Sequence, residues 1–155
     1  MTEVAYPVVY AALHTLADST LTDVRVVDGF DFSQDPGDVL LLGVPNITDA
    51  TAIAAGSFDQ DMATLGTTHP RDETGAINCV LMAWVGETDE TSADAARTKA
   101  FGYLTELAVA LRAAPKLGTS LAYLKAQLGS GSIAEDKAAG ATCSVSFTVV
   151  YKARI

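Results

Sequence analysis

The sequence predicts an α+β fold in which a mostly antiparallel β-sheet carries a long helix and a short N-terminal helix packed on one face. Three observations lead to this class. The chain has 155 residues, 49% of them hydrophobic and 19% charged, which suits one compact domain covering residues 1–155. Two segments repeat apolar residues at helical spacing, and others alternate or run continuously apolar. The strand segments follow one another in pairs, which favours hairpins over a parallel sheet.

The first half of the chain supplies the short helix and four strands. Apolar residues at helical intervals predict a helix over Tyr6–Asp18. Two β-branched or apolar runs, Val24–Val27 and Asp38–Val44, predict strands, the second of them well buried. Segments Phe58–Leu65 and Ala76–Gly86 predict a hairpin, and both alternating faces of Ala76–Gly86 are apolar, so we expect it to be covered on both sides.

Two connections separate these strands. Residues Asn46–Gly56 are small and polar with no sustained period, which predicts a long loop. Residues His69–Gly75 are charged and end in glycine, which predicts an exposed polar tip for the hairpin.

The second half supplies the long helix and a closing hairpin. Alanine and leucine residues keep a helical register from about Thr91 to Ala114, and Pro115 with Gly118 ends the helix. Segments Leu121–Ile133 and Thr142–Ala153 predict two strands, the last of which alternates apolar and hydroxyl side chains and is therefore half-buried.

Charge and composition exclude several classes of function. The 19 acidic residues outnumber the 10 basic ones and give a net charge of −9, which argues against binding nucleic acid through its phosphates. No apolar run is long enough for a membrane helix, and Met1–Val4 lacks the basic region of a secretory signal, so we expect no membrane association and folding in a cytoplasm. Cys79 and Cys143 lie in apolar segments and are interpreted as buried thiols.

Short stretches of the sequence resemble cofactor or metal motifs, but none has the context or the spacing that the chemistry requires. Gly129–Ala134 satisfies GxGxx(G/A), but it neither opens a helix nor lies in a strand–helix–strand unit, so we interpret it as a strand end or turn. The two histidines, His14 and His69, form no metal-binding pair, and the paired carboxylates lack the spacing of a calcium loop. We therefore expect no catalytic residue, no metal and no cofactor.

Read together, the ordered segments resemble the tail terminator proteins of long-tailed (siphovirus-type) bacteriophages, especially those of actinobacterial hosts. The resemblance spans almost the whole chain and rests on the order and spacing of weak motifs. These motifs are VVDG at 26–29, DVLLLGV at 38–44, LMAWVGETD at 81–89 running into a helix that ends in ALR at 110–112, LGSGS at 128–132 and YKAR at 151–154.

The resemblance implies a structural protein of the virion tail and neck that assembles in the host cytoplasm. It would form a homo-oligomeric ring, with six subunits expected, at the head-proximal end of the tail tube, where it stops tail polymerisation and offers the surface for head docking. Its partners would be the tail tube protein and a neck or head–tail connector protein. DNA would pass through the lumen without specific binding, and an acidic lumen would favour sliding through charge repulsion.

A ring needs a heterologous contact, in which one patch of each subunit meets a different patch of the next. We expect it at the hairpin Phe58–Gly75 and at the exposed side of the last strand, with three apolar anchors and the charged tip of the hairpin. The alternative is that the apolar anchors fill the core of their own domain. The expected interface residues are Phe58, Met62, Leu65, Arg71, Asp72 and Glu73.

Two other interpretations remain open at this stage. A different neck, connector or completion protein of the same particle would share these physical properties and would differ only in its partner. A bacterial small-ligand domain would instead need a concave site with convergent polar groups.

Overall fold

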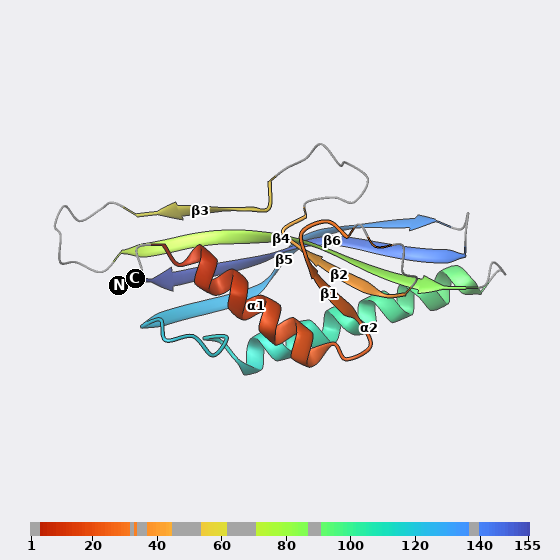
Figure 1. Ribbon diagram of the computed structural model, residues 1–155, viewed down its shortest axis with the longest axis horizontal. Coiled ribbons are helices and arrows are strands. Elements are labelled where there is room, and N and C mark those ends of the chain that lie inside the picture. Colours follow the sequence, from red (N-terminus) through yellow and green to blue (C-terminus); the bar gives the residue numbers. More distant parts are fainter. Residues whose placement is uncertain are drawn as a thin grey trace.

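The computed structural model contains two helices and one six-stranded sheet, and the α+β class is confirmed (Figure 1). It describes residues 4–31, 33, 37–44, 54–61, 71–86, 91–136 and 140–155. The helices are α1 (Tyr6–Thr20) and α2 (Ser92–Ala113). The strands are β1 (Arg25–Asp28), β2 (Val39–Leu42), β3 (Gly56–Gln60), β4 (Asp72–Val85), β5 (Tyr123–Asp136) and β6 (Ala141–Arg154).

Two long strands form the middle of the sheet. β4 and β6 are each 14 residues long and pair antiparallel over their whole length, and β5 pairs with the other side of β6. On its remaining side, β4 pairs with β3 over Glu73–Ile77 and with β2 over Cys79–Met82. We call the rows of the sheet that reach β3 the β3 half, and the rows that reach β2 the β2 half.

The main core lies between the sheet and the helices. α1 buries Val9, Leu13 and Ala17, and α2 buries a second stripe that includes Leu107 and Leu111. These side chains share one cluster with the inward-facing residues of β2, β4, β5 and β6. Figure 1 shows α1 crossing one face of the sheet, with α2 running along its lower edge in this view. Both helices therefore bury their apolar stripes against the same side of the sheet.

A second, smaller core lies on the opposite face of the β2 half. It contains Val39, Leu41, Val44 and Val80, with Phe30 packed against them. Alternate residues of β2 and β4 thus enter different cores, because successive side chains of a strand point to opposite faces. The prediction that apolar material covers both faces here is confirmed, and β2 is buried at all four positions.

The element order matches the prediction, but the first hairpin differs in its bounds. β4 begins at Asp72 rather than Ala76, so Asp72–Gly75 are strand residues and their assignment to a polar tip is wrong. β3 begins at Gly56 and includes only the first part of the predicted Phe58–Leu65 strand. The charged residues escaped the strand prediction because two of them have partners on β6 and α1 that only the tertiary structure provides.

Two further differences concern connections and direction. β1 and β2 run parallel, with Arg25 opposite Val39, so this pair is not the hairpin that adjacent strands suggested. Parallel pairing needs a longer connection than a tight hairpin turn, and ten residues separate β1 from β2 in the sequence. Residues 46–53 of the predicted loop, and His69, lie outside the described residues.

Candidate interaction surface

The predicted interface residues are distributed over β3 and the start of β4. Phe58 lies on β3 with 52% of its surface exposed, and Arg71 precedes β4 with an exposed side chain. Asp72 is half-buried and Glu73 is buried. Met62 and Leu65 lie outside the described residues, so their role as apolar anchors stays a prediction. Phe58 is thus the described apolar anchor that remains available for a contact.

Glu73 is a buried hub rather than a surface residue. Its carboxylate is fully buried and accepts a hydrogen bond from the backbone N–H of Ala5 at 3.0 Å and one from Gln60 Nε2 at 2.8 Å. It also accepts one from the hydroxyl of Tyr151 at 2.7 Å. A buried carboxylate needs such partners because the loss of hydration is otherwise uncompensated. Glu73 therefore joins the start of α1, β3 and β6, and its expected place at a subunit contact stays a prediction.

Aromatic rings surround this hub. Tyr6 lies between Phe58, Tyr10 and Tyr151, with ring centroids 6.1 to 6.4 Å apart. Burial raises the pKa of Tyr6. At Gly75 a Cβ atom would lie 2.6 Å from the ring of Tyr151, so only glycine leaves room for that ring. The exposed side of Phe58 is thus the rim of a packed aromatic cluster in the β3 half.

Asp72 belongs to an exposed ion-pair group at the same end of the sheet. Arg154 Nε donates to Asp72 Oδ1 at 2.7 Å, and Lys152 Nζ lies 3.7 Å from Oδ2. The hydrogen bond from Arg154, followed by the charges of Arg154 and Lys152, lowers the pKa of the Asp72 carboxyl. Asp72 therefore stays ionised and balances part of the positive charge that β6 carries at its C-terminal end.

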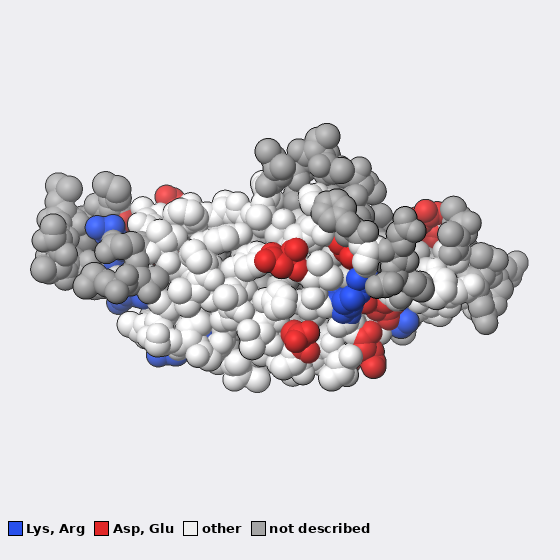
Figure 2. Space-filling model, in the orientation of Figure 1, with Lys and Arg blue, Asp and Glu red and all other residues white. Residues whose placement is uncertain are grey.

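Elsewhere on the surface, charged side chains form groups rather than being evenly distributed. Figure 2 shows one face of the molecule, the one that α1 crosses in Figure 1, as largely uncharged, with acidic side chains in small separate groups. Basic side chains lie beside acidic ones to the right of centre in this view, and others lie at the end of the molecule where β6 ends and β5 begins (Figure 2). The exposed basic residues of these two strands at that end are Lys125, Lys152 and Arg154.

β5 forms a long outer edge of the sheet. Among the described residues no strand pairs with its outer side, and the register of its pairing with β6 shifts between Leu128 and Gly131. The sequence motif Gly129–Ser132 lies at this shift, inside the strand, and a β-bulge there explains its two glycines. A Cβ on Gly131 would lie 3.0 Å from the carbonyl oxygen of Ser146. The two glycines thus allow the backbone geometry of the bulge, and the dinucleotide interpretation is rejected.

The last strand does not offer a free edge. β6 pairs with β4 on one side and β5 on the other, so the exposed side expected for it exists only as a sheet face. On the face away from the helices, Ser146 and Thr148 line a hollow of about 300 Å³ together with Asn78 and residues of the bulge. Where the β3 half meets the β2 half, this face therefore presents mainly hydroxyl and amide groups.

Two polar clusters, which sequence reasoning missed, attach α2 to the sheet. Asp38 is buried and accepts hydrogen bonds from the backbone N–H of Trp84 at 2.9 Å and from the hydroxyl of Tyr103 at 2.6 Å. Lys99 Nζ lies 2.7 Å from the same carboxylate. The signal in the sequence is an acidic residue directly before an apolar strand, but its partners are 46 to 65 residues away in the chain.

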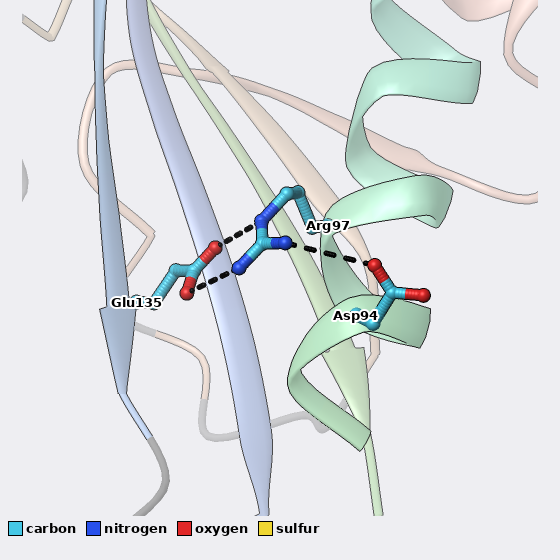
Figure 3. Close-up of polar contacts among 3 residues, drawn as sticks. All are labelled: Asp94, Arg97 and Glu135. Atoms are coloured by element: carbon cyan, nitrogen blue, oxygen red, sulfur yellow. Dashed lines mark hydrogen bonds and ion pairs between the residues drawn. The ribbon is translucent and has the colours of Figure 1, made fainter. Parts of the chain in front are cut away.

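The second cluster joins α2 to the closing hairpin (Figure 3). Arg97 donates from Nε to Glu135 Oε1 at 2.6 Å and from Nη2 to Oε2 at 3.1 Å, and Asp94 lies 3.6 Å from Nη1. The bidentate arrangement fixes orientation better than a single contact does. Together the two clusters position the sheet on α2.

The cysteines and the described acidic residues show no arrangement for chemistry. Cys79 and Cys143 are free and buried, and burial raises the pKa of the Cys79 thiol to about 12. In the described ranges, no group of three or more His, Cys, Asp or Glu side chains could hold a metal ion. No described helix is long and apolar enough to span a membrane.

A second hollow of about 300 Å³ lies on the β2 half. Its floor includes Val39, Leu41 and Met82, and at its rim Arg25 lies 2.6 Å from Asp31. The guanidinium charge at the rim is therefore already balanced.

Comparison of the chain with protein-family models gives no match, and comparison with curated proteins gives none either.

Proposed function

We propose that this chain is a ring-forming tail terminator of a long-tailed bacteriophage. Six copies would close a ring on the head-proximal end of the tail tube, stop its polymerisation and offer the docking surface for the head's connector. The protein would assemble in the host cytoplasm and remain in the tail of the virion. It would then act only by binding other copies and other proteins, without forming or breaking a covalent bond.

The observation that carries the proposal is that the sheet formed by the described residues has two unlike outer strands, each without a further strand on its outer side. β5 is an outer strand of 14 residues on one side, and β3 is a short outer strand on the other. Edges of a sheet offer unpaired N–H and C=O groups to a neighbouring chain. Two different edges on one subunit suit head-to-tail contacts, which make a ring when the rotation between subunits closes.

The polarity of the sheet also suits a channel wall. The helices cover one face, so a ring closed through the edges can hold them outside and turn the other face inward. Around the hollow near the middle of the sheet that face carries Asn78, Ser146 and Thr148, which are half-buried. Nearer the end of β6 it carries the exposed Lys125 and Lys152. Passage of DNA without specific binding is therefore supported by the net charge of −9 of the chain rather than by this face alone.

The test is tail length. In a phage that carries this gene, deletion should give overlong tail tubes and DNA-filled heads without tails, because nothing stops polymerisation. Added purified protein should block elongation of tail tube protein in vitro, seen as tubes of fixed length by electron microscopy. Tails of normal length on filled heads after deletion would remove the capping role. Blocked head joining with normal tail length would instead indicate a neck or completion protein.

A further inference from the structure

The two open edges of the β3 half lie at the same level of the sheet. Following one row across the strands, Asp59 of β3 pairs with Thr74, Thr74 with Lys152, and Lys152 with Lys125 of β5. The next row runs from Phe58 through Gly75 and Tyr151 to Ala126. The segment Tyr123–Leu128 of β5 therefore stands opposite the whole of β3, with β4 and β6 between them.

We propose that β5 of one subunit pairs antiparallel with β3 of the next copy of this chain, so that the sheet continues across the contact. The directions allow it: β3, β4, β6 and β5 alternate, so a second copy in the same orientation brings β3 beside β5 with opposite direction. The proposal rests on the proposed function in requiring subunits of one orientation, as in a ring.

Side chains match on both faces of the joined sheet when the rows stay level. On the face away from the helices, Lys125 would lie opposite Asp59 of the neighbour, and both are exposed. Opposite charges directly across an antiparallel pair stabilise it. On the helix face, the exposed ring of Phe58 would lie opposite Ala126, which is buried at the edge of the main core, so the ring would extend that core across the contact. The contact thus covers one of the large apolar side chains that the monomer exposes.

The same charges disfavour the symmetric alternatives. Antiparallel pairing of the regular segment Tyr123–Leu128 with its own copy would bring the basic ends of two subunits together, including Lys125, Lys152 and Arg154 from each. Pairing β3 with β3 would bring Asp59 and Asp61 near their copies. Like charges across an antiparallel pair destabilise it. The contact is therefore heterologous, and it can propagate around a ring.

The bulge sets the length of the joined segment. The register of β5 shifts after Leu128, and a bulge bends its strand and interrupts the hydrogen-bond ladder. The regular part of the edge, Tyr123–Leu128, is thus about as long as β3, which spans five residues. The proposed pairing of β5 with β3 of the next copy therefore ends where the two glycines of the sequence motif lie.

The test is disulfide trapping with Ser57→Cys and Gln127→Cys in one chain. Level rows place these exposed residues opposite each other across the contact. Within one chain they are separated by β4 and β6, roughly 14 Å, which exceeds the reach of a disulfide. Mild oxidation of the purified protein at high concentration should therefore give a ladder of covalent multimers on a non-reducing gel, and circular dichroism checks that the variant folds.

The single variants are the matched controls. S57C and Q127C alone should give no ladder, and a mixture of the two should give dimers only. The buried native cysteines give little background. A folded double variant that yields no multimer overturns the proposal. Dimers from Q127C alone that match those of the double variant also overturn it, because they indicate symmetric pairing of β5.

Charge exchange provides a second, independent readout. Lys125→Glu or Asp59→Lys should lower the yield of the ladder at least several-fold in the double-cysteine chain, and the two together should restore it. Lys116→Glu, an exposed residue beyond α2, is the control and should change nothing. Trapped multimers from a protein that fails to cap tails would leave the contact standing and remove the proposed function. A protein that caps tails but gives no trapped multimers would leave the proposed function standing and remove the proposed contact.

Discussion

The β2 half and the β3 half share β4 and β6 but are stabilised in different ways. In the β2 half, strand residues of alternate parity in β2 and β4 enter two cores, so these two strands are covered on both faces. In the β3 half one face is covered by α1 and an aromatic cluster, which lie beside the buried carboxylate of Glu73, and no second core covers the other face in the described residues. The comparison teaches that one pair of long strands can be covered on both faces at one end and on one face only at the other.

The largest expected effect comes from breaking the β2 half. Leu81 is 1% exposed and lies in the main core, so Leu81→Ala should lower the free energy of unfolding by about 2 to 5 kcal/mol through lost burial and the cavity left behind. Urea unfolding measures it. Val109→Ala on the exposed side of α2 is the control, with 52% exposure and an expected change within about 0.5 kcal/mol. Equal effects of the two substitutions would contradict this view of the core.

A smaller, more local effect is expected in the β3 half. Glu73→Ala removes the acceptor of three hydrogen bonds and should cost about 2 to 3 kcal/mol, because buried donors are left without partners. Hydrogen exchange should accelerate at β3 and the start of α1 before it does at β2. Glu73→Gln should lower the free energy of unfolding by less than half as much as Glu73→Ala does. The side-chain amide can still accept hydrogen bonds from Ala5 and Gln60 and donate one to Tyr151.

If Glu73→Gln proves as damaging as Glu73→Ala, the negative charge rather than the hydrogen-bond geometry stabilises this half. If hydrogen exchange accelerates equally in both halves, they unfold as one unit and the distinction between them is wrong for stability.

The smallest effect concerns pH at the exposed end. The pKa of Asp72 is lowered in the folded chain, chiefly by the hydrogen bond from Arg154. Its contribution to stability is therefore present above the ordinary carboxyl pKa of 3.8 and is lost as the pH falls through the lower folded value. NMR titration should find Asp72 ionised below pH 3.8, and Arg154→Gln should raise its pKa. An unchanged pKa in that variant would assign the shift to other groups.

The sequence predicted the fold class and element order because periodicity records burial directly. Val39–Leu42 and the alternation of Cys143–Tyr151 are examples, since their apolar residues enter the core whatever their distant partners are. Glu73 and Asp38 were beyond such reasoning. Their neighbours in the chain are polar or apolar in no special pattern, and the groups that compensate their charge are 13 to 78 residues away. Phe58 was predicted as an anchor, and its exposure keeps that prediction open.

The continuous pairing of β4 with β6 also has a mechanical consequence. Asp72 pairs with Arg154 at one end and Val85 with Ala141 at the other, so the strands lie antiparallel and side by side along the full length of the subunit. A force that pulls β4 and β6 past each other along their length loads the whole hydrogen-bond ladder in shear. Many backbone hydrogen bonds must then break together rather than one at a time. The subunit is therefore stiff along its long axis, a property that would suit the proposed place at the end of a tail.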